Sequence, residues 1–146
     1  MELVLTSSEK QLLSGQEILL FQPTPSKDKL TWWDGTEHSN SYHKRDWRQL
    51  DKPLPCGETV IEHAFVWNGA SVGPLRFAFP KWKHPIATCR HDKRCAIAGR
   101  FKKTHPELYH KLRKFADQQF KKDVTVRGNW WEVNAGYAAV RLGAVL

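Results

Sequence analysis

The stretch PIATCRHDKRCAIA, residues 85–98, predicts the first of the long helices on which the fold is built. Pro85 suits the first turn of a helix, where its missing amide hydrogen costs no hydrogen bond. A second helix is predicted over 104–122, because Thr104 and Glu107 have the spacing of a capping box. Its apolar side is marked by residues at helical spacing, namely Leu108, Leu112, Phe115 and Phe120, with Gln119 as the one polar member.

The end of the chain predicts a hairpin and then a last helix. Residues 124–133 surround Gly128-Asn129, a residue pair typical of two-residue hairpin turns. Asn134 is able to cap a helix over 135–142, whose small residues permit close packing.

The first half of the chain predicts short strands. Residues 17–21 and 30–33 are apolar or β-prone and are separated by a proline-containing break, whereas 34–58 are polar and predict turns and irregular structure. The best strand is predicted over 59–67, with the odd positions from Ile61 on one face. We therefore predict an α+β fold, with strands and hairpins first and then about three helices with one intervening hairpin.

Length and composition fit one folded domain over residues 1–146. The chain has 146 residues, and 40% of them are hydrophobic. No apolar run approaches the roughly 20 residues needed to cross a bilayer, and the first residues lack the basic and apolar segments of a signal peptide. We expect a chain that is made and folded in a cytosol.

Positive charge is concentrated in the second half of the chain. Residues 1–80 hold 8 basic and 10 acidic side chains, whereas 81–146 hold 15 and 5, a net charge of +10. Such a surface suits anionic lipid, nucleic acid or an acidic protein, or it is a solvated face that keeps the protein soluble. Seven tryptophans, including the pairs 32–33 and 130–131, suit a membrane interface or a protein groove, or they cover a small core.

The dipeptide His91-Asp92 is the strongest chemical signal. On the helix over 85–98, His91 shares a face with small residues, which are Ala87, Thr88, Cys95 and Ala98, and these leave a hollow beside the imidazole. Neighbouring side chains diverge by about 100° on a helix, so the pair suits two tasks: His91 as general base and Asp92 as ligand to a hard cation. Asp117 on the second helix is the candidate that orients the base.

Two alternatives compete with this assignment. Asp117 has the spacing for an ion pair with Arg113, which would be a structural role. Cys95 and His91, four residues apart, share a face and offer two ligands to a transition metal, but no second pair of ligands is evident. The three cysteines, Cys56, Cys89 and Cys95, are odd in number and are expected to be reduced thiols.

Four motifs, in order, resemble a widespread family of uncharacterised proteins of tailed phages and prophages. The resemblance covers residues 59–143. Its motifs are Gly69-Ala70-Ser71 with Pro74, Ala87 with His91-Asp92, Ala116-Asp117 with Phe120, and Tyr137 with Val140-Arg141 and Gly143. Residues 1–58 are a variable, β-rich part outside it. This chain departs from the pattern in three places: Asn68 replaces an aspartate, Val72-Gly73 interrupts the approach to Pro74, and Lys93-Arg94-Cys95 replaces aromatic residues.

The two central helices are also similar to those of phospholipase A2-like domains. This similarity implies that His91 activates a water, that Asp92 holds Ca²⁺, and that Asp117 orients His91. It further implies a calcium-binding loop that includes Asn68, Gly69 and Gly73. The expectation is a tail or baseplate protein of the virion that contacts other virion proteins and hydrolyses esters of anionic phospholipid.

Two other functions stay open. One is a purely structural tail component with a degenerate site, in which His91-Asp92 is a buried polar link between helices. The other is a nucleic-acid-binding protein that uses the basic residues of 81–127, for which affinity would fall steeply with salt.

Overall fold

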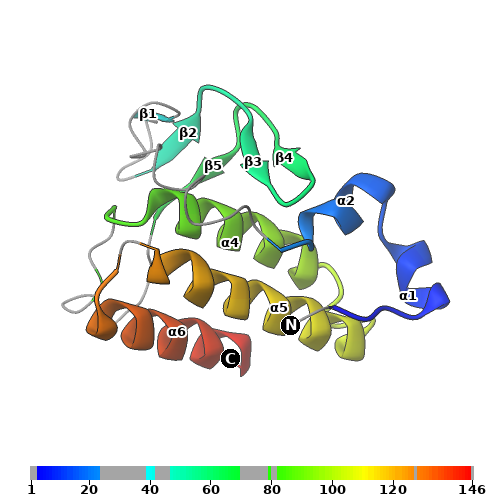
Figure 1. Ribbon diagram of the computed structural model, residues 1–146. Helices are drawn as coiled ribbons and strands as arrows, with labels where there is room; N and C mark the ends of the chain where they lie inside the picture. The colour runs from blue at the N-terminus through cyan, green and yellow to red at the C-terminus, as the bar shows by residue number, and fades with distance from the viewer. Residues whose placement is uncertain are drawn as a thin grey trace.

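Three long helices form one layer of the molecule (Figure 1). The structure is a computed structural model and describes residues 3–23, 39–41, 47–69, 79, 82–126 and 128–145. In chain order the long helices are α4 (Pro85–Gly99), α5 (Pro106–Thr125) and α6 (Trp130–Val145). Each runs opposite to the one before it, so α5 packs against α4 on one side and α6 on the other.

The predicted helices over 85–98 and 104–122 are confirmed, with one correction at the start of α5. Pro106 occupies the first turn, but the N-cap residue is His105, and its side chain makes no capping hydrogen bond. The expected capping box from Thr104 is therefore wrong. The Thr104 hydroxyl lies 2.9 Å from His105 Nδ1 instead.

The hairpin predicted over 124–133 is wrong, because α5 continues to Thr125 and α6 begins at Trp130. The Gly128 amide donates to the Val124 carbonyl over 2.7 Å and closes the end of α5. The Asn129 side chain then accepts from the Glu132 amide over 2.9 Å, so this residue caps α6 five positions before the expected cap. The turn pair thus joins two helices and not two strands.

Two short helices precede the strands, so the strand predicted over 17–21 is also wrong. They are α1 (Ser7–Leu12) and α2 (Gly15–Leu20), and each begins with a complete capping box, Thr6 with Glu9 and Ser14 with Glu17. These reciprocal bonds stabilise helices too short to show periodicity. The strand predicted over 30–33 lies outside the described residues.

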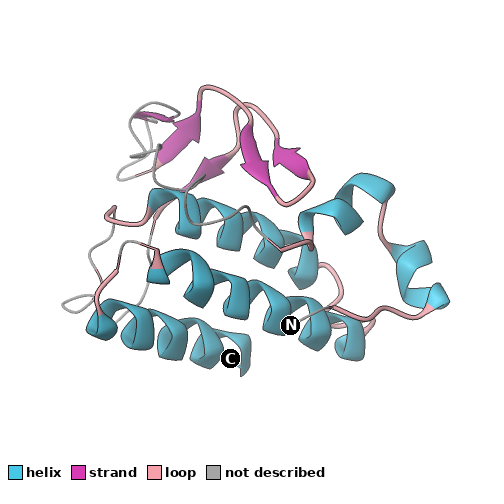
Figure 2. Ribbon diagram, in the orientation of Figure 1, coloured by secondary structure: helices cyan, strands magenta, loops and turns pink. Residues whose placement is uncertain are grey.

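The strands are short and form two small sheets beside α4 (Figure 2). One sheet has the antiparallel order β1-β2-β5, from β1 (Ser39–Ser41), β2 (Arg48–Leu50) and β5 (Val66–Trp67). The other is the pair β3 (Leu54–Cys56) and β4 (Thr59–Ile61), with Leu54 opposite Ile61. The fold is α+β as predicted, although three of these strands fall in the segment expected to be irregular.

The single strand predicted over 59–67 is wrong, because a turn divides it. Ala64 has φ 72°, and its amide donates to the Leu50 carbonyl over 2.9 Å. This turn moves the chain from one sheet to the other, so that Ile61 and Trp67 are both buried but belong to different sheets. His63, which would share a face with Ile61 and Trp67 in one continuous strand, is exposed.

Two buried arginines of α4 fasten the first half of the chain to the helices. Arg90 Nε and Nη2 donate to the Pro55 carbonyl over 2.9 and 2.7 Å. Arg94 Nε donates to the Leu20 carbonyl over 2.8 Å. Part of the positive charge of the second half therefore lies inside the molecule and not on its surface. All three cysteines are free thiols, as expected.

Candidate functional site

His91 and Asp117 meet between α4 and α5. His91 Nε2 lies 2.7 Å from Asp117 Oδ1, and both side chains are buried. An ionised carboxylate accepts hydrogen bonds only, so Nε2 carries the proton in this pair. The other ring nitrogen, Nδ1, then has its lone pair available, and the Cys95 sulfur lies 3.8 Å from Nδ1 and 3.4 Å from Nε2. The orienting contact expected from the sequence is therefore present.

Asp117 is held by two arginines as well. Arg113 Nε donates to Oδ1 over 3.0 Å, and Arg141 Nη1 of α6 donates to Oδ2 over 2.7 Å. Arg113 also donates through Nη2 to the Val140 carbonyl over 2.9 Å. The ion pair that the sequence offered as an alternative thus coexists with the histidine contact. Arg141 appears in a motif of the resemblance, but its inward direction was not predicted.

A cavity of about 220 Å³ lies against this group. Thr88, His91, Asp92 and Cys95 of α4 form one wall, and Ala139, Val140 and Gly143 of α6 form another. Arg113 and Phe120 of α5 and Gly69, which follows β5, complete the described lining. The hollow beside the imidazole therefore exists, and small residues of α6 contribute to it as much as those of α4.

Burial sets the protonation of the cavity wall. Burial lowers the pKa of His91 below its ordinary value, although the hydrogen bond and charge of Asp117 oppose this. The imidazole is therefore neutral near pH 7 and able to accept a proton. Burial also raises the pKa of Asp92 to about 7, with Arg113 opposing, and raises the pKa of Cys95 to about 12, so that Cys95 stays a thiol.

The other predicted site residues are only partly brought together. Asp92 and Gly69 line the cavity with His91, and Gly69 has a φ of 71°, in the left-handed region. Asn68 is partly exposed and is not among the lining residues. Gly73 lies outside the described residues.

The described residues alone do not make a calcium site. Ca²⁺ takes six to eight oxygen ligands, whereas Asp92 supplies the one carboxylate on the described cavity wall, and the cation Arg113 faces the same space. A transition metal fits better by distance, since donor atoms of His91, Cys95 and Asp117 lie within 4.8 Å of one another. Two arginines already occupy the Asp117 oxygens, however, and the Cys95 thiol is hard to ionise.

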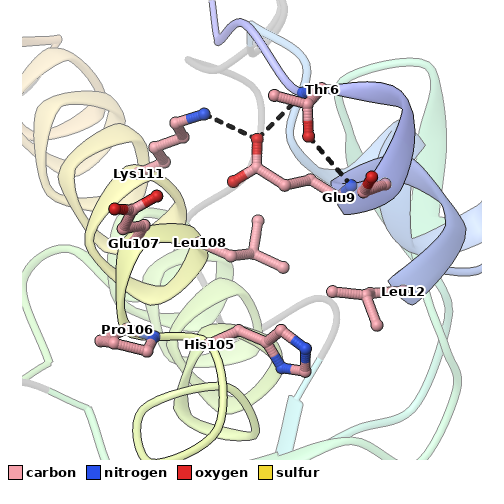
Figure 3. Close-up of a pocket in the computed structure, with 9 residues that line it drawn as sticks. Thr6, Glu9, Leu12, His105, Pro106, Glu107, Leu108 and Lys111 are labelled. Atoms are coloured by element: carbon pink, nitrogen blue, oxygen red, sulfur yellow. Dashed lines mark hydrogen bonds and ion pairs between the residues drawn. The ribbon is translucent and has the colours of Figure 1, made fainter.

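A larger cavity of about 510 Å³ lies between α1 and the start of α5 (Figure 3). Leu12, Leu108 and Pro106 give it apolar walls. Its central polar contact is an ion pair of 2.6 Å between Lys111 Nζ and Glu9 Oε1, and Glu9 also accepts from the Thr6 amide. These groups satisfy one another and hold no base–acid pair like that of His91 and Asp117. No pattern in the sequence predicted this cavity.

Comparison with known proteins identifies no relative. No family model, no curated protein and no solved structure matches the chain. None of the helices in the described part of the chain is both long enough and apolar enough to cross a membrane.

Proposed function

We propose that the protein is a hydrolase in which His91 is the general base and Asp117 orients it. The observation that carries this proposal is the 2.7 Å contact between His91 Nε2 and Asp117 Oδ1 at the wall of a cavity. A histidine whose second nitrogen is held by a buried carboxylate keeps one tautomer and one ring orientation, which are the requirements of a base that acts repeatedly.

The reaction that fits this arrangement is ester hydrolysis. His91 Nδ1 takes a proton from a water, and the water oxygen bonds to the carbonyl carbon of the ester. The tetrahedral intermediate then collapses, the bond from carbon to the alcohol oxygen breaks, and the protonated imidazole returns its proton to that oxygen. Asp117 stabilises the transient imidazolium, while hydrogen bonds from Arg113 and Arg141 hold Asp117 in place.

The substrate class and setting follow from the resemblance. The motif order supports a virion protein of a tailed phage, and the two central helices support a phospholipid ester as substrate. The cavity volume of about 220 Å³ suits the ester region of a lipid better than a whole lipid molecule. Calcium stays a prediction of the resemblance, tested by titration calorimetry of the wild-type protein with CaCl₂.

Fatty-acid release from vesicles that contain phosphatidylglycerol tests the proposal. We expect release by the wild type and a loss of about 10²-fold or more in His91→Gln, because general-base catalysis contributes that much. His105→Gln is the matched control, since His105 is exposed and its Nδ1 contacts a neighbouring hydroxyl. Release with chelator present would remove calcium from the mechanism. No release by folded wild type, or equal release by His91→Gln, would contradict the proposal.

A structural role is the second candidate, and one observation favours it. Asp117 of α5 binds α4 through His91 and α6 through Arg141, so it connects all three long helices. A tail component without catalysis would need this connection equally. Such a protein would lose several degrees of melting temperature in His91→Ala and would release no fatty acid as wild type. For the nucleic-acid-binding alternative, Arg90 and Arg94 are buried and contribute no surface charge, whereas several lysines of 81–127 are exposed.

A further inference from the structure

The outer side of α6 is apolar and exposed. Trp131 and Leu142 are 67% and 58% exposed, and Ala138 between them is exposed as well. Ala138 and Leu142 follow Trp131 by 7 and 11 residues, which places the three side chains on one face of the helix. In Figure 1, α6 forms the edge of the helix layer, with α5 on its inner side.

Both charged residues of α6 are engaged with groups of the protein. Glu132 is buried and binds His84 Nε2 over 2.5 Å, and Lys83 as well. Arg141 binds Asp117. The exposed face of α6 consequently carries no unengaged charge, and Trp130, 66% exposed, lies in T-shaped contact with Trp131 at its first turn.

Lys121 borders this face, and Lys114, seven residues before it, lies on the same side of α5. The exposed charged side chains of α5 after residue 112 are all positive: Lys114, Lys121 and Lys122. Lys121 Nζ lies 4.9 Å from the ring of Tyr137 on α6, which places this lysine at the boundary of the two helices. The acidic residues of the same stretch, Asp117 and Asp123, are buried.

Apolar helix faces with tryptophan and flanking lysine are typical of helices that lie in a membrane interface. Tryptophan prefers the headgroup level, apolar side chains enter the acyl boundary, and lysines bind anionic headgroups. We infer that the outer face of α6, formed by Trp130, Trp131, Ala138 and Leu142, docks the protein onto an anionic phospholipid bilayer.

This inference extends the proposed function and rests on it for its catalytic consequence. Gly143 lines the cavity beside His91, is itself exposed, and directly follows Leu142. A bilayer on the outer face of α6 therefore lies next to the wall of the cavity. The lipid ester would then reach His91 from the interface and not from solution.

A second copy of the chain is a poorer occupant of the same face. A two-fold contact uses the same patch on both copies. The border lysines Lys114 and Lys121 of the two copies would then lie along one contact. An anionic bilayer neutralises these charges, whereas a second copy adds like charges to them.

Vesicle sedimentation in the presence of chelator tests docking apart from hydrolysis. The probe is a set of sucrose-loaded phosphatidylcholine vesicles with and without phosphatidylglycerol. We expect the wild type to bind only the anionic vesicles, and a double variant, Trp131→Gln with Leu142→Gln, to bind about tenfold or more weakly. Lys121→Gln should cost about fivefold at low salt. Val60→Gln is the matched control, because Val60 is exposed on β4, away from α6.

The outcomes separate docking from catalysis. Binding by wild type and by His91→Gln without any fatty-acid release would support docking and reject the hydrolase. Hydrolysis of a soluble short-chain ester without vesicle binding would support the hydrolase and reject docking. Equal binding by the double variant and by Val60→Gln would overturn the inference. Light scattering that shows a dimer of the wild type, abolished in the double variant, would overturn it in favour of a second copy.

Discussion

Asp117 is the residue on which the account depends most. It is fully buried, and its two oxygens accept hydrogen bonds from one histidine and two arginines. A buried carboxylate is tolerable only with such compensation, since removal of one partner leaves charge unpaired in a poorly solvated place. The same compensation keeps the carboxylate fixed for His91. Stability and the proposed catalysis thus make the same demand on this position.

Arg141→Met should lower the free energy of unfolding by roughly 1–2 kcal/mol. A charge-assisted hydrogen bond is lost from a buried carboxylate, while the partial exposure of Arg141 reduces the loss. Arg100→Met is the matched control, because Arg100 pairs with Glu17 on the surface and such pairs contribute about 0–1 kcal/mol. Urea denaturation measures both variants. Equal losses in the two would mean that Arg141 does not support Asp117.

Among the secondary-structure elements, the long periodic helices α4 and α5 were predicted from the sequence, whereas the short helices α1 and α2 were not. A proline in the first turn predicted both α4 and α5, and a stripe of apolar residues at helical spacing also predicted α5. The contact between His91 and Asp117 was expected because a general base needs an orienting partner and because the resemblance implies that role for Asp117. The capping box of Ser14 and Glu17 was available as a signal for α2, but the apolar residues 18–21 suggested a strand in its place.

Other features of the elements could not come from local sequence. The turn pair 128–129 suits a hairpin and a helix connection equally, and the cap from Asn129 decides between them. The division between β4 and β5 depends on a hydrogen bond from Ala64 to Leu50 of another strand. The direction of Arg141 depends on which side of α6 meets α5, and an almost uniformly apolar helix does not reveal that side.

The packing of α6 on the layer predicts a sharp difference between two glycines. A Cβ at Gly136 would lie 2.7 Å from Phe79 Cε2, whereas Gly99 has nothing within 4 Å. Gly136→Ala should therefore destabilise the protein by about 1–3 kcal/mol through overpacking. Gly99→Ala should be neutral or slightly stabilising, since alanine is the better helix former. Melting curves of the two variants check this, and a similar shift in both would show that α6 does not pack as described.

At the scale of the whole molecule, buried ionic groups hold the layers together. Arg90 and Arg94 join the strands and α2 to α4, and Glu132 joins α6 to the segment before α4 through His84 and Lys83. The free energy of unfolding of a molecule held together by such groups should depend on pH. Some charged residues of the second half of the chain therefore connect elements inside the molecule. The amino-acid composition did not reveal this.

The burial and hydrogen bonds of Glu132 predict how the free energy of unfolding changes at acid pH. Burial raises its pKa, but hydrogen bonds from Lys83 and His84 outweigh burial, so that the folded-state pKa lies below the ordinary value. A group with a lowered pKa stabilises the fold above its unfolded pKa, and this contribution is lost as pH falls through the folded pKa. Unfolding free energies measured from about pH 5 downward should fall less steeply in Glu132→Gln than in wild type. Parallel curves would contradict the assignment.

We propose that His91 and Asp117 act as one catalytic unit, and a double-mutant cycle on fatty-acid release measures the coupling between them. Rates are measured on phosphatidylglycerol vesicles for His91→Gln, Asp117→Asn and the double variant, each per folded molecule as judged by circular dichroism. If Asp117 acts through His91, the double variant is no slower than His91→Gln alone, because residues of one unit are not additive. A double variant slowed by the product of the two single effects would contradict the claim.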